Sequence, residues 1–521
     1  MGNARMIHPK INFDEIEGTS VSDGEIWQVF VFKSDAVTDS EFVRCLGDLK
    51  QSISSNPSVQ ISAGIEIAKR GQNKSIGILL KEAVRFDASY IPNLISIFSK
   101  SDTSLLYSDY RIESKTRLID IQLPAWSPIR FESIDYLGRV LAFDMGRLNS
   151  SDGDAVTSNE LVRRALDEQL RVSRLPRFSY TAMGFESHIN HSTFENNHAN
   201  SISVVIPTKG ISDQTSSLLE RCISKLSKQT WSKELELIVV VDIGYEKSVL
   251  DRVKKLCPPA WSFKLVEFNE DFNFSQKCNA GVRAASGEVL IFLNDDVEFI
   301  SEDAISKLAD LSLRDGVGAV GSQLKFPDGS IQHGGITLQD VKPRNSYLDQ
   351  FPYSTFTGDL AVSHEVSAVT GACLVLSRSN FDLCGGWNEE LHNSYNDVDL
   401  CLRLNHMGLK TVMRNDLDVL HHESVTRDAG FDEASFAKLK SLWPADLGNE
   451  QYLRSPEALG IGYQGTWGMN KGLRLELSGK YFQYLLHLLK NRGLIRTIDA
   501  FSRRISGKTS NLLRSEFKSY L

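Results

Sequence analysis

Two adjacent carboxylates follow a strongly apolar stretch, and their types and spacing could support chemistry. Residues 289–293 form an apolar run that ends abruptly at Asn294-Asp295-Asp296. Such a run, bounded by a turn signal, predicts a buried strand with its carboxylates at the rim of a sheet, where ligands bind in open α/β folds. Adjacent carboxylates repel each other unless a cation lies beside them, and a divalent metal that carries a phosphate is such a cation. A solvated turn or a helix cap is the alternative interpretation.

Other polar residues lie where they could serve the same site. Asp242 ends a second apolar run, so it falls at the same predicted rim and could accept hydrogen bonds from a ribose or a base edge. A local Asx turn explains Asp242 equally well. Asp397 and Asp399 open a segment of helical spacing, and carboxylates are favoured at helix starts. We expect Asp399 to be the cap, which leaves Asp397 for chemistry. His421-His422 follows a short apolar segment later in the chain.

Strands and helices alternate from residue 201 onward. The spacing of apolar runs and helical segments is typical of βαβ units with a parallel sheet. The predicted strands are 203–206, 235–241, 263–268, 289–293, 317–324 and 369–376, and the predicted helices are 216–229, 248–256 and one that begins near 275. Asp328-Gly329, with apolar residues on both sides, predicts a hairpin. This part of the chain is therefore predicted to be an α/β domain with a mostly parallel sheet.

The whole chain is predicted to have four regions. They are a smaller α/β domain over 1–185, a polar linker over 186–200, a catalytic α/β domain over 201–440 and a helical C-terminal region over 441–521. Residues 78–86 repeat the apolar frame of 291–299 at a constant offset, and Ala83 stands where the second copy has Asp296. This match predicts an internal repeat whose first copy lacks the metal carboxylate; chance similarity is the alternative.

The composition is that of an ordinary globular protein. The chain has 521 residues, of which 41% are hydrophobic and 24% charged, and its net charge of −8 argues against general nucleic-acid binding. Seven scattered cysteines without a CxxC pair suit buried thiols in a reducing cytosol better than a disulfide framework or a zinc site. The first residues contain no apolar segment typical of a secretory signal, and no apolar run reaches the roughly 18 residues of a membrane span.

Positive charge is concentrated at one end of the chain. Residues 471–521 carry eleven Lys and Arg against three Asp and Glu, a net charge of +8, whereas the rest of the chain carries −16. An apolar block at 481–489 lies among these basic residues, and a basic amphipathic helix is typical of membrane-surface binding. We therefore favour binding to an anionic membrane surface, with packing on the folded body as the alternative.

Seven motifs between residues 201 and 430, together with the strand that ends in Asp242, resemble the family-two glycosyltransferases in the family's own order. The motifs are SVVIPTK, FNFSQKCNAGVRAASGEVLIFLNDD, DGSIQHGG, VTGACLVLSR, CGGWNEEL, YNDVDLCLRLNHMG and HHES. The sequence is most similar to the bacterial branch that builds O-antigens, capsules and other surface polysaccharides. Pieces such as YSDYRI, LPAWSPIRFESIDYLGRVLAF and RLPRFSYTAM resemble a second, degenerate domain of the same kind. The resemblance implies a GT-A fold, a nucleotide-sugar donor, Mn²⁺ or Mg²⁺, and inversion at the anomeric carbon.

The resemblance also implies roles on the nucleotide and metal side. The residues that would bind nucleotide or donor are Pro207, Thr208, Asp242, Asn294 and Asp295, with Asp295 toward the ribose. Asp296 would be the principal metal ligand. His421 would complete the metal site, and His422 is the alternative ligand.

A second set of roles concerns the sugar and the acceptor. Gly371 and Ala372 would form the wall near the donor sugar. Asp397 would be the catalytic base, preceded by Asn396 where the family usually has Glu. Trp387 would be an aromatic platform on the acceptor side, where His333 would also lie.

The implied activity is transfer of a hexosyl or deoxyhexosyl group from a UDP-, dTDP- or GDP-linked sugar to a lipid-linked bacterial surface glycan. The expected location is the cytoplasm, at the inner face of the cell membrane. One alternative is a non-catalytic glycan-binding or scaffold protein of a polysaccharide assembly complex. Another is a sugar nucleotidyltransferase, a class that usually carries an N-terminal Gly-rich loop with a basic residue, which we do not find here.

Overall fold

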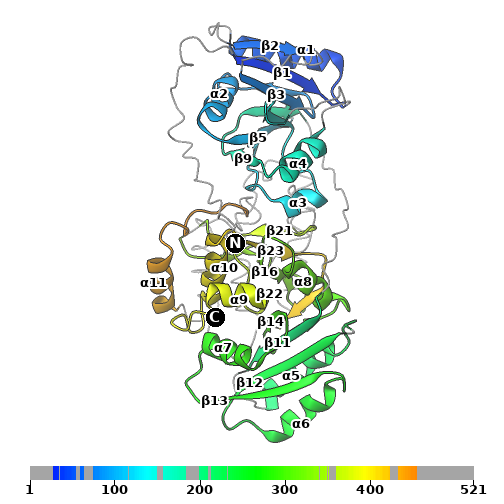
Figure 1. Cartoon of the computed structure of the whole chain (residues 1–521), viewed down its shortest axis with the longest axis vertical. Coiled ribbons are helices and arrows are strands. Elements are labelled where there is room, and N and C mark those ends of the chain that lie inside the picture. Colours follow the sequence, from blue (N-terminus) through cyan, green and yellow to red (C-terminus); the bar gives the residue numbers. More distant parts are fainter. Residues whose placement is uncertain are drawn as a thin grey trace, which may run out of the picture. The chain divides into compact units, whose positions relative to one another are not determined.

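The computed structural model describes residues 27–453, apart from 35, 54–58, 64–73, 115–116, 149–156, 184–198, 209–212, 232, 340, 349, 351–359 and 423–431. The chain divides into two compact units, Met1–Ser192 and Thr193–Leu521. Each unit contains one large β-sheet with helices against it (Figure 1). The predicted basic tail at 471–521 and most of the predicted linker lie outside the described residues.

The second unit begins with four parallel strands joined by helices. β11 (Ser201–Pro207), β12 (Glu234–Asp242), β13 (Ser262–Phe268) and β14 (Val289–Leu293) alternate with α5 (Asp213–Leu226), α6 (Lys247–Leu256) and α7 (Phe274–Ala284). The strands lie in the order β13-β12-β11-β14. All five residues of β14 are buried, as expected for a parallel strand covered by helices. The predicted alternation is confirmed, although α5 begins at Asp213 rather than at 216.

The same sheet continues beyond β14 with mixed strand directions. β22 (Cys373–Ser377) runs antiparallel to β14 and is followed by β16 (Val317–Ser322), β23 (Lys410–Arg414) and β21 (His364–Val366). α8 (Ala304–Ser312), α9 (Arg378–Cys384) and α10 (Asn396–His406) pack against these strands. α11 (Glu433–Leu442) follows near the end of the described chain. The predicted α/β fold with a mostly parallel sheet is confirmed.

A small second sheet adjoins the carboxyl end of β14. It contains β15 (Val297–Phe299), β24 (Val419–His421), β17 (Leu324–Lys325) and β18 (Ile331–His333), in that order. β17 and β18 are antiparallel, and Gly329 between them has φ of 83°, so the predicted hairpin is confirmed. Two short strands, β19 (Ile336–Thr337) and β20 (Arg344–Asn345), follow in the sequence and pair with each other.

The first unit is built from shorter elements of the same kinds. Its larger sheet has the order β2-β1-β3-β8-β5-β9 and its smaller sheet β4-β10-β6-β7. The strands are β1 (Trp27–Lys33), β2 (Val59–Ala63), β3 (Lys74–Leu80), β4 (Val84–Phe86), β5 (Thr103–Ser108), β6 (Tyr110–Ser114), β7 (Arg117–Ile121), β8 (Val140–Asp144), β9 (Arg171–Leu175) and β10 (Tyr180–Met183). The helices are α1 (Asp39–Ser52), α2 (Tyr90–Lys100), α3 (Pro128–Ser133) and α4 (Ser158–Asp167).

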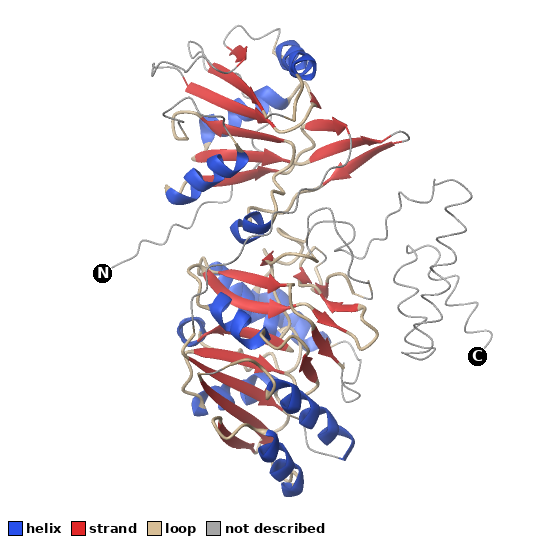
Figure 2. Cartoon of the chain, turned by 90° about the vertical axis from the view of Figure 1, so that its right-hand side faces the viewer, coloured by secondary structure: helices blue, strands red, loops and turns tan. Residues whose placement is uncertain are grey.

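Strand order and direction agree between the two units. β2-β1-β3-β8-β5-β9 has the same sequence of parallel and antiparallel pairs as β12-β11-β14-β22-β16-β23. β4-β10-β6-β7 likewise corresponds to β15-β24-β17-β18. Figure 2 shows the strands of each unit with helices against them.

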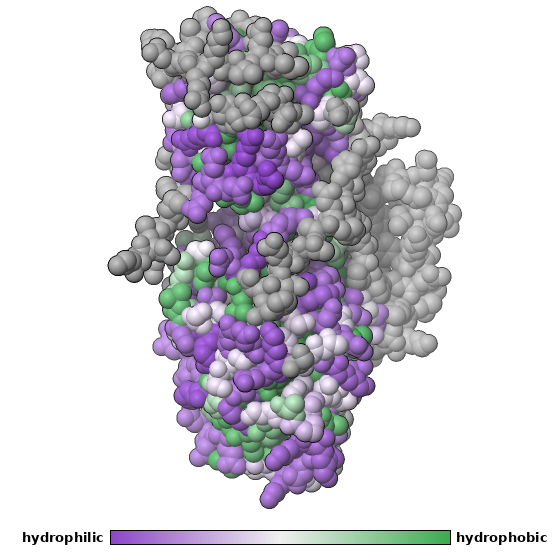
Figure 3. Space-filling view, turned by 45° about the vertical axis from the view of Figure 1, so that its right-hand side comes forward, coloured by the Kyte–Doolittle hydropathy of each residue, from purple (hydrophilic) through white to green (hydrophobic). Residues whose placement is uncertain are grey.

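Apolar residues lie mainly inside the two units. The exposed large apolar side chains are scattered, and Figure 3 shows hydrophilic residues over most of the coloured surface in that view. All seven cysteines are free, and six of them are buried. Among the described helices, none has the length and apolar character needed to cross a bilayer.

Candidate active site

Asp296 lies in the turn between β14 and β15. Its side chain is 2% exposed, and its backbone oxygen accepts a hydrogen bond from the N–H of His422 at 3.0 Å. On the other side of the turn, the N–H of Asn294 donates to the backbone oxygen of Ala372 at 2.9 Å. These bonds hold the Asp296 carboxylate at the carboxyl end of the central strand.

Strand pairing brings His421 beside Asp296. His421 is the last residue of β24, where it pairs with Val297 of β15. Its Nε2 lies 3.0 Å from Oδ1 of Asp296, and its Nδ1 binds Oε1 of Gln332. The ring of His421 therefore lies between the Gln332 amide and the Asp296 carboxylate.

The Asp296–His421 pair fits a divalent metal. Both carboxylate oxygens of Asp296 are buried, and a buried carboxylate is costly unless a cation or a hydrogen-bond donor offsets its charge. The 3.0 Å separation matches neighbouring ligands on an octahedral ion with bonds of about 2.1 Å. Across the described ranges, no group of three or more His, Cys, Asp or Glu side chains is placed to hold a metal. A pair of protein ligands would leave coordination positions for a substrate phosphate and water, as Mg²⁺ prefers.

His422 points to a different partner. Its Nε2 binds Oε1 of Glu298 at 2.6 Å, and Arg221 binds the same carboxylate oxygen at 2.5 Å. Glu298 is only 4% exposed, so the Arg221 guanidinium offsets its buried charge and His422 adds a side-chain contact. The structure thus places His421, and not His422, beside Asp296.

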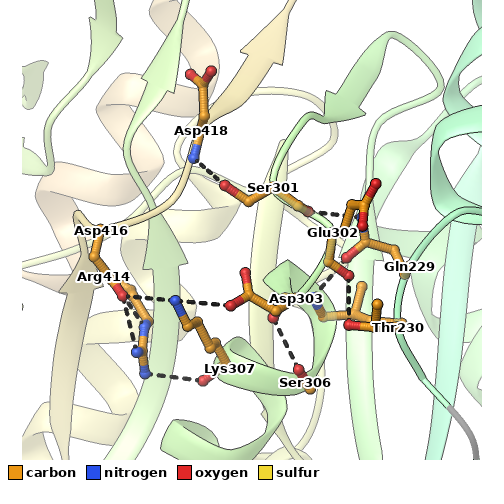
Figure 4. A network of polar contacts seen from close by, with 11 residues as sticks. Gln229, Thr230, Ser301, Glu302, Asp303, Ser306, Lys307, Arg414, Asp416 and Asp418 are labelled. Carbon is orange, nitrogen blue, oxygen red and sulfur yellow. Dashed lines mark hydrogen bonds and ion pairs between the residues drawn. The ribbon is translucent and has the colours of Figure 1, made fainter. Parts of the chain in front are cut away.

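A polar network fixes the turn that leads into β24 (Figure 4). The N–H of Asp418 donates to Oγ of Ser301 at 2.9 Å, and the backbone oxygen of Asp418 accepts from the N–H of Ser301 at 3.2 Å. Lys307 and Arg414 both bind the carboxylate of Asp416, at 3.2 Å and 2.8 Å. Because β24 begins directly after this turn, the network helps to set the register that brings His421 to Asp296.

A polar bridge crosses three neighbouring strand ends. Nζ of Lys277 lies 2.5 Å from Oδ1 of Asp242 at the end of β12, and it donates to the backbone oxygen of Thr208 at 2.6 Å, just after β11. Thr208 Oγ1 in turn donates to Oδ2 of Asp295 at 2.6 Å, just after β14. Pro207 is the last residue of β11. The predicted nucleotide-side residues Pro207, Thr208, Asp242 and Asp295 thus share one rim.

Burial and charge shift the pKa values of these groups. Burial raises the pKa of Asp295 to about 6, with the neighbouring charge of Asp296 adding to it and the Thr208 hydrogen bond opposing it. Burial also acts to raise the pKa of Asp296, but the His421 ring outweighs it and leaves that pKa below its ordinary value. Burial lowers the pKa of Lys277, against the opposing effect of Asp242. The rim therefore holds buried charges that are only partly compensated within the protein.

Asp397 lies at the start of α10. Its Oδ1 accepts the N–H of Val398 and its Oδ2 the N–H of Gly371, each at 2.9 Å. Asn396 is buried and donates through Nδ2 to Oγ of Ser275 at 3.1 Å. The residue that replaces the family's Glu thus ties the start of α10 to α7. The sequence therefore places a carboxylate at a helix N-terminus, where its ionised form is favoured.

Asp399 is not the helix cap. Tyr395 occupies the N-cap position with a left-handed φ of 62°. Asp399 is 2% exposed, binds Nε of Arg403 at 2.9 Å and accepts from Nε1 of Trp443 at 2.9 Å. The expectation for Asp399 was wrong because a tertiary partner, absent from the local sequence pattern, engages its carboxylate.

One pocket of about 260 Å³ joins these groups. Asn294 and His421 line it from the side of Asp296, and Asp397 lines it from the start of α10. Gly371 and Ala372 form the wall between them. Gly371 is hydrogen-bonded to Asp397, and Ala372 is hydrogen-bonded to Asn294. Of the predicted site residues, Asn294, Gly371, Ala372, Asp397 and His421 therefore line one cavity.

Two predicted acceptor-side residues are buried. Trp387 is 2% exposed and packs edge-on against Phe274 and Phe292, with ring centroids 5.5 Å and 5.0 Å apart, so it is a core residue and not an exposed platform. His333 is 1% exposed; its Nδ1 binds Asn345 at 2.8 Å, and its Nε2 accepts the N–H of Thr370 at 3.3 Å. Burial lowers the pKa of His333 to about 4, so it is neutral at pH 7. His333 supports the pocket wall from the protein interior through Thr370, which lines the pocket.

Sequence reasoning missed two residues of the site. Lys277 lies within the motif FNFSQKCNAGVRAASGEVLIFLNDD and Gln332 within DGSIQHGG, and neither motif assigns them a role. The available signal for Lys277 was a lysine next to a cysteine on the apolar face of a predicted helix, where a lysine needs a buried carboxylate as its partner.

Known proteins are similar to the part of the chain that contains this rim. Residues 203–384 match the family model "Glycosyl transferase family 2". This stretch, and not the whole chain, is similar to the family 2 glycosyltransferases. The match to the family 2 domain includes the rim residues from Pro207 to Asp296 and the Gly371 wall, whereas Asp397 and His421 lie beyond its end.

Several curated relatives are similar to the same part of the chain. An uncharacterized protein y4gI of Sinorhizobium fredii is 34% identical over 229 residues, which is 43% of this chain and 25% of that protein. The O-antigen biosynthesis protein RfbC of Myxococcus xanthus is 31% identical over 233 residues, 44% of this chain and 18% of that protein. An N-acetylglucosaminyl-diphospho-decaprenol L-rhamnosyltransferase of Mycobacterium tuberculosis is 29% identical over 172 residues, 30% of this chain and 55% of that enzyme. The chain thus spans a quarter or less of the first two relatives.

Solved structures resemble the chain only distantly. The mannosyltransferase PcManGT of Pyrobaculum calidifontis, in complex with GDP-Man and Mn²⁺, is 14% identical, with a TM-score of 0.35 and coverage of 60% of this chain and 90% of that chain. TarS 1–349 of S. aureus, in complex with UDP-GlcNAc, is 15% identical, with a TM-score of 0.36 and coverage of 60% and 86%. Similarities of this size carry no functional inference.

Proposed function

We propose that this protein is a metal-dependent, inverting glycosyltransferase that moves a sugar from a nucleotide-diphosphate sugar to a hydroxyl group of a growing glycan. The carrying observation is that His421, which contacts Asp296, and Asp397 line the same pocket. One side of the pocket suits a cation with a diphosphate, and the other presents a carboxylate. An inverting transfer needs both, on opposite sides of the anomeric carbon.

Asp397 would act as the general base. It removes the proton of the acceptor hydroxyl as that oxygen attacks C1, and the diphosphate leaves from the opposite face. Positioned proton removal of this kind contributes typically about 10²–10⁴-fold to the rate. The two backbone N–H groups on Asp397 fix the direction of its carboxylate. The turn at Gly371 then keeps the base at a constant place relative to the donor side.

Asp296 and His421 would hold Mn²⁺ or Mg²⁺. When bound, such an ion supplies Lewis-acid stabilisation of the charge that develops on the leaving diphosphate. Thr208, Asp242 and Asp295 would bind the nucleotide of a UDP-, dTDP- or GDP-linked sugar along the rim of strands β11, β12 and β14.

Names of the relatives support a surface-glycan acceptor. RfbC is named for O-antigen biosynthesis, and the mycobacterial enzyme is named for a diphospho-decaprenol substrate. We infer that the acceptor is a lipid-linked bacterial surface glycan and that the enzyme works in the cytoplasm at the inner face of the membrane. The basic 471–521 segment would attach it to anionic lipid.

The first unit would be a degenerate, non-catalytic copy of the second. Val84 pairs with Ala182 as Val297 pairs with His421, so Ala182 stands where the second unit has His421. Ala83, next to Val84, is the counterpart of Asp296. This unit would buttress the catalytic domain or hold the growing glycan.

The ion pairs of the first unit fit the same interpretation. The N–H of Lys81 donates to the oxygen of Arg139 at 2.9 Å, as that of Asn294 does to Ala372. Arg139 forms an ion pair with Glu82, the counterpart of Asp295, and Lys81 forms one with Asp135 at 2.9 Å. The protein's own cations thus occupy the rim where the second unit would need a metal.

A donor-hydrolysis assay separates this proposal from its two alternatives. Nucleotide sugars with Mn²⁺ should be cleaved slowly to nucleoside diphosphate and sugar, and faster with a suitable acceptor. A scaffold protein would give no turnover with any donor. A nucleotidyltransferase would instead release pyrophosphate from a nucleoside triphosphate and a sugar phosphate.

A further inference from the structure

We propose that Arg221 is a positioning residue for the metal site, and that it acts through Glu298 and His422. These three residues, the Arg221 cluster, hold the end of β24 so that His421 stays beside Asp296. The inference rests on the proposed function, because the metal that it concerns is the one in that proposal. The described lining of the pocket includes none of the three side chains, so the Arg221 cluster would act on the site through other residues.

Glu298 is a buried carboxylate that the proposed chemistry does not use. It lies on β15 between Val297 and Phe299, which are 0% and 2% exposed. Nη2 of Arg221, a residue of α5, lies 2.5 Å from Oε1 of Glu298. Removing the partner of a buried charge is strongly unfavourable. The guanidinium group therefore fastens β15 to α5 at this point.

His422 extends the same cluster to the end of β24. Its Nε2 lies 2.6 Å from Oε1 of Glu298 and 3.1 Å from Nη2 of Arg221. Its backbone N–H donates to the backbone oxygen of Asp296 at 3.0 Å. Because His421 directly precedes His422, fixing both the side chain and the N–H of His422 also fixes the backbone that carries the His421 ring.

The pairing of β15 with β24 is short enough to need such support. It contains three residue pairs, and His421 is in the last of them along β24. A slip of one residue would turn its ring to the other face. The bond between Ser301 and Asp418 holds the start of β24, and the Arg221 cluster holds its end. Groups that orient a metal ligand typically contribute about 10–100-fold to metal affinity.

The affinity for Mn²⁺ at a fixed excess of UDP, measured by titration calorimetry well below the unfolding transition, tests this role. An ion pair that only stabilises the fold would leave the affinity of the folded protein unchanged. Arg221→Met removes the charge, and Arg221→Gln serves if the first variant does not fold. Arg252→Met is the matched control, because Arg252 binds Glu220, the neighbour of Arg221 on α5, at 2.8 Å in a pair that is 47% and 29% exposed.

We expect Arg221→Met to weaken Mn²⁺ binding about tenfold, the lower end of the usual effect of such partners. Arg252→Met should stay within about threefold of wild type, because exposed ion pairs contribute little. In the Glu298→Gln background, the further change Arg221→Met should alter the affinity by less than about twofold, since no carboxylate remains for the guanidinium group to hold.

Three results would overturn the role of Arg221. They are wild-type Mn²⁺ affinity in folded Arg221→Met, an equal loss in Arg252→Met, and a full tenfold loss from Arg221→Met in the Glu298→Gln background. A wild type that binds no Mn²⁺ with UDP would instead overturn the proposed function, and the role of Arg221 with it.

Discussion

Gly371 donates its backbone N–H to Oδ2 of Asp397 at 2.9 Å. The next residue, Ala372, accepts a hydrogen bond from the N–H of Asn294, also at 2.9 Å. A two-residue turn therefore connects the start of α10 to the end of the central strand. If Asp397 is the base and Asp296 the metal ligand, this turn sets the distance between the two carboxylates.

Asp397→Asn should separate donor binding from transfer. The amide is nearly isosteric and still accepts one of the two backbone N–H groups, but it cannot take a proton. We expect nucleotide-sugar affinity within a few-fold of wild type and a loss of about 10²–10⁴-fold in transfer, measured by calorimetry and by product release. Asp399→Asn is a useful control because Asp399 lies on the same helix and is buried away from the pocket. Near-normal transfer by Asp397→Asn would remove this residue from the role of base.

Asp295→Asn should stabilise the metal-free protein at neutral pH. The folded pKa of about 6 lies above the ordinary value of 3.8, so stability is lost as pH rises from about 4 through 6. The variant has no such charge, and Thr208 can still donate to the amide oxygen. We expect it to be more stable than wild type by roughly 2–3 kcal/mol at pH 7, with a difference below about 1 kcal/mol at pH 4.

Thermal unfolding of both proteins in a chelator, at pH 4 and pH 7, measures this difference. Addition of Mn²⁺ to the wild type should shrink the gap at pH 7, because a cation offsets the buried charge. A variant that is less stable than wild type at pH 7, or a gap that does not depend on pH, would contradict the buried-charge account.

The local sequence pattern was sufficient to predict the part of the site that depends on a single strand. β14 is apolar throughout, so its end and the position of Asp296 could be predicted from residues 289–296 alone. The choice between His421 and His422 could not, because adjacent residues in a strand point to opposite faces and only the register of β24 against β15 decides which one meets Asp296.

Residues whose role depends on distant partners were harder to predict. Lys277 binds groups at the ends of two different strands, and no spacing in the sequence indicates that these groups lie close together. Trp387 was placed on the acceptor side because aromatic rings often bind sugars, but Phe274 and Phe292 enclose it. The same applies to Asp399, whose partner Trp443 lies in a segment that carried no motif.

Arg139→Met should destabilise the first unit without changing the chemistry. Arg139 and Glu82 are 8% and 19% exposed, and removing the cation leaves a largely buried carboxylate. We expect a loss of about 2–3 kcal/mol in unfolding free energy, below the usual 3–5 kcal/mol because Glu82 keeps some exposure. Arg85→Met, in an exposed pair with Glu113, should cost less than about 1 kcal/mol.

Donor binding and turnover, measured below the unfolding transition, should be the same in both arginine variants and in wild type. Loss of Mn²⁺-dependent nucleotide binding in folded Arg139→Met would show that the first unit takes part in the site, against its proposed non-catalytic role.

Deletion of 471–521 should remove membrane attachment and spare activity. The segment carries a net charge of +8. Its attraction to anionic lipid should weaken with salt, since the Debye length falls to about 3 Å at 1 M. Vesicle sedimentation should show salt-sensitive binding of the full chain to anionic vesicles, no binding of the truncated chain, and largely retained transfer to a short soluble acceptor. Continued sedimentation of the truncated protein would place the membrane contact elsewhere.

The most direct test of the account is the position of Mn²⁺ in crystals of the protein grown with UDP, read from its anomalous scattering. We predict one strong peak within bonding distance of an Asp296 carboxylate oxygen and of Nε2 of His421, in contact with the diphosphate and facing the pocket that Asp397 lines. The peak should disappear in Asp296→Ala with the fold intact. A peak at His422 and Glu298, a metal in the first unit, or a nucleotide bound at full occupancy without metal would contradict the proposed mechanism.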